Sequence, residues 1–101
     1  MSSELPYQEV PTPDYESVMT ESAQLIDVRQ PDEVAGGTLP GAVNIPLDQL
    51  EDRVGEVDPD RRVVLLCRSG NRSGTAAQFL ASQGYGDLVN LAGGMLAMPA
   101  D

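Results

Sequence analysis

Short apolar runs alternate with helix-like stretches along most of this chain. Five segments are predicted strands, at residues 8–10, 24–28, 42–45, 62–66 and 88–91, and the second of them has the apolar run of a buried strand. The stretches between them carry helix signals, and such alternation is typical of a parallel sheet with helices on its faces. The pattern therefore predicts a single α/β domain over residues 7–101, preceded by a short leader at residues 1–6.

Four helices are expected between the strands. Thr12 is a candidate N-cap with Pro13 at the first helical position, which predicts a helix after the first strand. Further helices are expected at residues 31–35, at residues 47–54, where apolar side chains fall at i, i+3 and i+7, and at residues 73–83.

The segment at residues 62–66 is the strongest predicted strand. Its continuous β-branched and aliphatic run suits a central strand that is covered on both faces. It leads directly into a polar loop, Cys67-Arg68-Ser69-Gly70-Asn71-Arg72-Ser73. Because ligands of open α/β sheets bind beyond the carboxyl ends of the strands, this loop is the candidate site.

The amino-acid composition excludes several kinds of catalytic, metal and disulfide site. The chain has one cysteine and no histidine, which excludes an intrachain disulfide, Cys-His and Ser-His-Asp catalysis, and histidine metal sites. We therefore expect no metal and no cofactor. A lone cysteine, and an N-terminus without a basic or apolar signal, favour a cytoplasmic protein. The formal net charge of −10 argues against nucleic acid and anionic membranes as partners.

Cys67 is the candidate nucleophile. Loop N–H groups and the dipole of the following helix favour an anion, so they should lower the pKa of the thiol. Arg68 and Arg72 flank the loop, and Arg72 could also hold an oxyanion in a bidentate contact. The alternative, a buried and inert cysteine, fits the polar loop poorly.

Two charged residues near the end of the segment at residues 24–28 leave alternatives open. Asp27 is either a general base or a strand-end carboxylate that accepts hydrogen bonds from loop N–H groups, and the second role is favoured. Arg29 either binds a substrate anion or pairs with one of the many carboxylates.

Four blocks of sequence, in the same order, resemble single-domain rhodaneses, a family of sulfurtransferases. They are Leu-Ile-Asp-Val-Arg at 25–29, Leu-Pro-Gly-Ala-Val-Asn-Ile-Pro at 39–46, the loop at 67–73, and Leu-Ala-Gly-Gly at 91–94. The resemblance runs from about residue 11 to residue 94. It implies a rhodanese-like α/β fold with a five-stranded, mostly parallel sheet flanked by helices on both faces.

The resemblance also implies roles for the site residues. Cys67 would carry a sulfane sulfur as a persulfide, and the backbone of residues 68–73 would bind the outer sulfur. Asp27 and Arg29 would lie beside the loop, with Asp27 bracing it. Thr38 and Met98 stand where many members have histidine and tryptophan, and the second change suggests a differently packed C-terminal edge.

Loop length separates this chain from phosphatases and arsenate reductases of similar fold. Those enzymes use Cys-x5-Arg, whereas Cys67 and Arg72 form a tighter Cys-x4-Arg loop. A smaller loop suits a sulfur atom better than a phosphate, so we expect no phosphatase activity.

The expected function is sulfur transfer from a small donor, such as thiosulfate or a persulfide, to a thiophilic acceptor that could be a protein. We expect a monomer or a weak dimer. The alternatives are a sulfur-carrier or regulatory module that serves one protein partner, and a thiol-dependent reductase.

Overall fold

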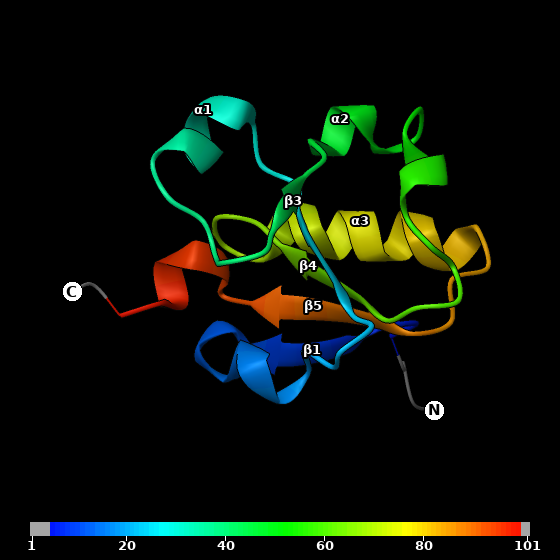
Figure 1. The fold of residues 1–101 in the computed structure, drawn as a ribbon, viewed down its shortest axis with the longest axis horizontal. Coiled ribbons are helices and arrows are strands. Elements are labelled where there is room, and N and C mark those ends of the chain that lie inside the picture. The colour runs from blue at the N-terminus through cyan, green and yellow to red at the C-terminus, as the bar shows by residue number, and fades with distance from the viewer. Residues whose placement is uncertain (1–4, 100–101) are drawn as a thin grey trace.

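A five-stranded sheet runs through the centre of the molecule (Figure 1). The computed structural model describes residues 5–99 of the chain. The strands lie in the order β1-β5-β4-β2-β3, and every strand pairing is parallel. Their bounds are Gln8–Pro11 (β1), Gln24–Asp27 (β2), Val43–Asn44 (β3), Val63–Leu66 (β4) and Leu88–Ala92 (β5). This confirms the predicted strands and the central place of β4. Most of the predicted leader, residues 1–4, lies outside the described residues.

Helices cover both faces of the sheet, as predicted. Leu47–Leu50 (α2) and Asn71–Ser82 (α3) pack on one face, where Val63 and Leu65 of β4 point. The opposite face is covered by two 3₁₀ helices, Thr12–Ser17 and Gly94–Ala97, and their flanking residues. Pro31–Ala35 (α1) follows the carboxyl end of β2.

The continuous apolar run of β4 explains its central position. Successive strand residues point to opposite faces, so a strand with a helical layer on each side needs apolar side chains throughout. All four residues of β4 are fully buried. Leu65 belongs to the same buried cluster as Ala76, Ala77 and Leu80 of α3.

Three helix predictions need correction. Thr12 does not cap a helix: its Oγ1 donates a hydrogen bond to the carbonyl oxygen of Ala92 at 3.0 Å and ties the first 3₁₀ helix to β5. The helix expected at residues 47–54 is two pieces, α2 and a 3₁₀ helix at Val54–Glu56, because Arg53 has φ −112° and ψ 14°. The helix α3 begins at residue 71 and not 73.

Candidate functional site

The Cys67 loop connects the carboxyl end of β4 to α3, and two glycines fix its shape. Gly70 has φ 101°, a left-handed conformation that glycine adopts without strain, and a Cβ there would lie 3.1 Å from the backbone nitrogen of Gly93. Gly94, with φ 56°, packs against the loop so closely that a Cβ would overlap the carbonyl oxygens of Cys67 and Arg68.

The segment after β5 holds the carbonyl groups of this loop. The N–H of Met95 donates to the carbonyl oxygen of Cys67 at 2.8 Å, and the N–H of Leu96 donates to that of Arg68 at 3.0 Å. The Gly93-Gly94 pair thus makes the expected turn, and it also brings two N–H donors to the loop. With these carbonyl oxygens held on one side, N–H groups of the loop are left to face the cysteine sulfur.

The Cys67 sulfur accepts hydrogen bonds from this loop and from the start of α3. Cys67 is fully buried, with the N–H of Gly70 3.0 Å from Sγ and the hydroxyl of Ser73 3.3 Å from it. Burial by itself raises the pKa of the Cys67 thiol, but the hydroxyl and N–H of Ser73 and the N–H groups of Gly70 and Ser69 outweigh it, and the pKa falls below its ordinary value. The geometry therefore favours the thiolate with no base beside it.

Arg72 is bound by a carboxylate that the sequence did not single out. Its two Nη atoms donate to Oε1 and Oε2 of Glu33 in α1 at 2.7 and 2.8 Å. The hydrogen bond from Arg72, followed by that from the N–H of Gln30, lowers the pKa of Glu33 to about 2. The bidentate contact predicted for a substrate oxyanion is thus occupied by Glu33, while the positive charge of Arg72 still acts on Cys67.

Asp27 and Arg29 form a buried ion pair beside α1. The Asp27 carboxylate accepts hydrogen bonds from Nε and Nη2 of Arg29 at 3.0 and 2.8 Å, from the Arg29 N–H, and from the Thr38 hydroxyl at 2.7 Å. Nη2 of Arg29 also donates to the carbonyl oxygen of Gly37 at 2.7 Å. Arg29 was expected either to bind a substrate anion or to pair with a carboxylate, and in the structure it pairs with Asp27.

The structure corrects the expectation that Asp27 braces the Cys67 loop. Within residues 5–99, Asp27 has no hydrogen bond to residues 67–73; its carboxylate holds the segment that leads into and out of α1. Because α1 carries Glu33, this pair reaches the loop indirectly, through Glu33 and Arg72.

One further residue near the sulfur, Asn90, was missed by sequence reasoning. Asn90 in β5 accepts a hydrogen bond from the Ser73 hydroxyl, and its Nδ2 donates to Oε2 of Glu9 at 2.8 Å. The available signal was a single amide inside an otherwise apolar strand. Such a buried amide needs partners, and it finds them at the candidate site.

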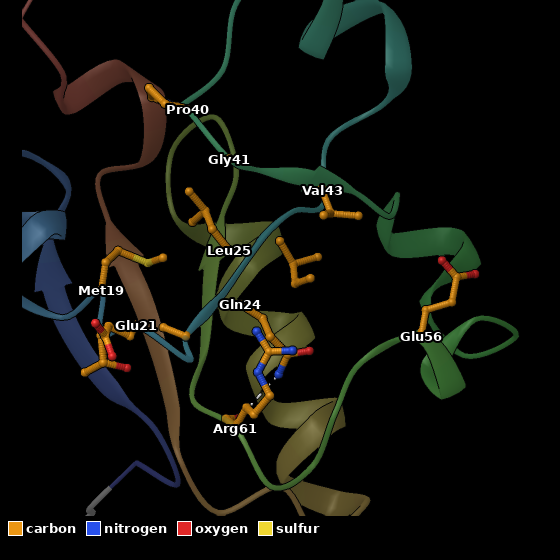
Figure 2. Close-up of a pocket in the computed structure, with 12 residues that line it drawn as sticks. Met19, Glu21, Gln24, Leu25, Pro40, Gly41, Val43, Glu56 and Arg61 are labelled. Atoms are coloured by element: carbon orange, nitrogen blue, oxygen red, sulfur yellow. Dashed lines mark hydrogen bonds between the residues drawn. The ribbon is translucent and has the colours of Figure 1, made fainter.

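A pocket of about 440 Å³ lies away from this loop, between β2 and the segments around β3 (Figure 2). Figure 2 shows Gln24 and Leu25 of β2 on one side of it and Val43 of β3 on another. None of residues 67–73 lines this pocket, so it is not where the cysteine chemistry would occur.

The described residues hold neither an evident metal site nor a membrane-spanning helix. Across residues 5–99, no three or more acidic, cysteine or histidine side chains are grouped so that they could hold a metal ion. Over the same residues, no helix is both long and apolar enough to cross a membrane.

Sequence comparisons find relatives among proteins named as sulfurtransferases. A "Sulfurtransferase" of Allochromatium vinosum is 45% identical over 78 residues, which cover 77% of this chain and 73% of that protein. The uncharacterized protein YqhL of Bacillus subtilis is 51% identical over 72 residues, or 71% of this chain and 57% of that protein. Thiosulfate sulfurtransferase GlpE of Shewanella oneidensis is 38% identical over 81 residues, with 78% of this chain and 80% of that protein covered.

Solved structures show the same fold. A rhodanese-like domain protein from Staphylococcus aureus superposes with a TM-score of 0.83 at 28% identity, covering 93% of both chains. The human single-domain sulfurtransferase TSTD1 gives 0.74 at 31% identity, covering 93% of this chain and 95% of that one. The family model for the rhodanese-like domain matches residues 13–100. Relatives named as sulfurtransferases support a transferase, and the chain belongs to the rhodanese-like domain family.

Proposed function

We propose that this protein is a sulfurtransferase that carries a sulfane sulfur as a persulfide on Cys67. The observation that best supports the proposal is the surroundings of Sγ, where N–H groups and a hydroxyl favour a thiolate in a chain that has no histidine. Fixed donors that lower the pKa of the thiol increase the fraction of the nucleophilic thiolate without a partner base.

The first half-reaction loads the sulfur. The Cys67 thiolate attacks the outer sulfur of a donor such as thiosulfate, and a new S–S bond forms to Sγ. The donor S–S bond breaks at the same time, and sulfite leaves with its electron pair. The transferred sulfur keeps one negative charge, which loop N–H groups between Arg68 and Ser73 would bind as they bind the thiolate.

The second half-reaction unloads it. A thiophilic acceptor, such as cyanide or the thiolate of a partner, attacks the outer sulfur, and the electrons of the S–S bond return to Sγ. The Cys67 thiolate is then the leaving group, so the donors that favour it also favour unloading. The same few groups thus support both half-reactions.

The charged residues around the loop have supporting roles in this proposal. Arg72 is held by Glu33, so it contributes positive charge near Sγ without closing on an oxyanion. Arg68 is exposed beside the loop and makes no ion pair among residues 5–99, which leaves its guanidinium available to attract an anionic donor. The proposed donor is thiosulfate or a persulfide. The proposed location is the cytoplasm.

Steady-state kinetics with thiosulfate and cyanide test this function. Two half-reactions on one residue predict parallel double-reciprocal lines, and Cys67→Ser should abolish thiocyanate formation. Intersecting lines, or turnover by the Cys67→Ser protein, would contradict the proposal. A protein that accepts sulfur but turns over slowly with cyanide, and quickly with a protein thiol, would act as a sulfur carrier. Hydrolysis of an aryl phosphate is not expected.

A further inference from the structure

Asn90 connects the cysteine loop to the far edge of the sheet. It is 1% exposed, and its amide Nδ2 donates to Oε2 of Glu9 in β1 at 2.8 Å and to the carbonyl oxygen of Gly70 at 3.2 Å. Its Oδ1 accepts the hydroxyl hydrogen of Ser73. Gly74 in α3 lies against this amide, and a Cβ there would be in ordinary van der Waals contact with Nδ2 at 3.5 Å.

The partners of Asn90 fix the orientation of its amide. Nδ2 faces a carboxylate oxygen of Glu9 and the carbonyl oxygen of Gly70, and both of these groups can only accept hydrogen bonds. A flipped amide would put Oδ1 against two acceptors and leave both contacts repulsive. Oδ1 therefore points at Ser73 and offers its hydroxyl an acceptor.

Ser73 faces two acceptors but has one proton to donate. Its Oγ lies 3.3 Å from Sγ of Cys67 and within hydrogen-bond distance of Asn90 Oδ1. Hydrogen bonds to a charged acceptor are roughly twice as strong as those between neutral groups, so a thiolate wins this competition. When Sγ is a thiol or the inner sulfur of a persulfide, the neutral amide oxygen becomes the better acceptor.

We propose that Asn90 is a positioning residue that accepts the Ser73 hydroxyl hydrogen bond while Sγ is uncharged and releases it when the thiolate returns. This inference rests on the proposed sulfurtransferase function, because the persulfide cycle is what alternates the charge on Sγ. No covalent bond changes: the hydroxyl of Ser73 rotates and keeps its proton. Asn90 thereby competes with the thiolate for the hydroxyl hydrogen of Ser73, and this competition favours the sulfur-loaded protein.

Charged groups also surround this network, and one of them, Arg72, acts on Cys67 through its charge. They come from β1, from the end of β2, from α1 and from α3, and they are Glu9, Asp27, Glu33 and Arg72. All of them keep their identities when Ser73 and Asn90 are replaced. A double-mutant cycle on that pair therefore removes their contribution to first order.

The test is a pH titration of the Cys67 thiolate by its ultraviolet absorbance, with the spectrum of Cys67→Ser subtracted. Four proteins are compared: the parent, Asn90→Val, Ser73→Ala and the double variant. Asn90→Val should raise the thiolate-to-thiol ratio at a given pH by about three- to tenfold, because Ser73 then donates to sulfur alone. Ser73→Ala should lower that ratio. In the Ser73→Ala background, Asn90→Val should change it by less than about twofold.

Two results would overturn the inference. If Asn90→Val changes the thiolate-to-thiol ratio equally with Ser73 present and with Ser73→Ala, the role of Asn90 is merely structural. If Asn90→Val leaves the ratio unchanged when Ser73 is present, Asn90 does not compete for the Ser73 hydroxyl. Glu9→Gln is the control for charge, since the new amide oxygen still accepts from Nδ2 of Asn90; any change it makes in the ratio should be the same with Ser73 present and with Ser73→Ala. If Asn90→Val does not fold, Asn90→Ala replaces it; it also removes the acceptor, so it should raise the ratio only when Ser73 is present. The titration uses no sulfur donor, so it separates this inference from the proposed function.

Discussion

The ion pair between Glu33 and Arg72 gives the sharpest stability prediction. Both Arg72 Nη atoms reach the Glu33 carboxylate at 2.7 and 2.8 Å, across the gap between α1 and α3. The side chains are 27% and 35% exposed, so the pair lies between a surface and a buried pair. Glu33→Gln keeps the size and one acceptor of this side chain but removes its charge, and it should loosen the contact that joins α1 to the cysteine loop.

The magnitude follows from the pKa of Glu33. A carboxyl whose pKa falls from 4.5 to about 2 would stabilise the folded state by about 3 kcal/mol if the whole shift counted. Because both side chains are partly exposed, solvent screening reduces this to about 1 kcal/mol. The pKa is lowered in the folded state, so this stabilisation is complete above pH 4.5 and is lost as the pH falls toward about 2.

Denaturant unfolding of the parent and Glu33→Gln at several pH values measures this difference. The variant should be about 1 kcal/mol less stable at pH 7, and the two proteins should converge as the pH falls toward 2. Glu56→Gln is the matched control, because Glu56 pairs with Arg53 on the exposed surface, where such pairs contribute little. A difference that is constant with pH, or equal for both variants, would refute the reasoning.

Three further substitutions test the contact of Gly94 with the cysteine loop, the core around Leu65 and the hydrogen bond from Thr38 to Asp27. Gly94→Ala should lower stability by about 2 kcal/mol or more in chemical denaturation and slow sulfur loading, whereas Gly86→Ala, where a Cβ meets nothing within 4 Å, should do neither. Leu65→Ala should cost about 2–5 kcal/mol in the same assay, and a smaller loss would mean that the core around α3 collapses onto the cavity. Thr38→Val should cost about 1 kcal/mol by removing a donor to Asp27, and an unchanged unfolding midpoint would show that this hydrogen bond adds nothing.

The sheet could be predicted from sequence because short strand-like segments alternate with helix-like ones, and the strongest of them, at residues 63–66, is an uninterrupted apolar run. The run at residues 63–66 even indicated its central place, since only a strand buried on both faces needs no polar position. Helix boundaries were less predictable. Residue 71 starts α3 because Gly70 adopts a left-handed conformation, and such a conformation is a property of the folded loop.

The candidate site was predictable in its nucleophile but not in its side-chain partners. Cys67 stood out because a polar loop follows a core strand. Glu33 and Asn90 did not, since both make their key contacts with residues more than fifteen positions away, at Arg72 and Ser73. Spacing along the chain carries no information about such pairs; parallel topology brings them together.

The most direct test of the account is the intact mass of the protein after incubation with thiosulfate. The parent should gain the mass of one sulfur atom and lose it on addition of cyanide, and Cys67→Ser should gain nothing, because Cys67 is the only cysteine in the chain. If the parent gains no sulfur, or Cys67→Ser gains as much as the parent, then Cys67 does not carry a persulfide and the central claim is wrong.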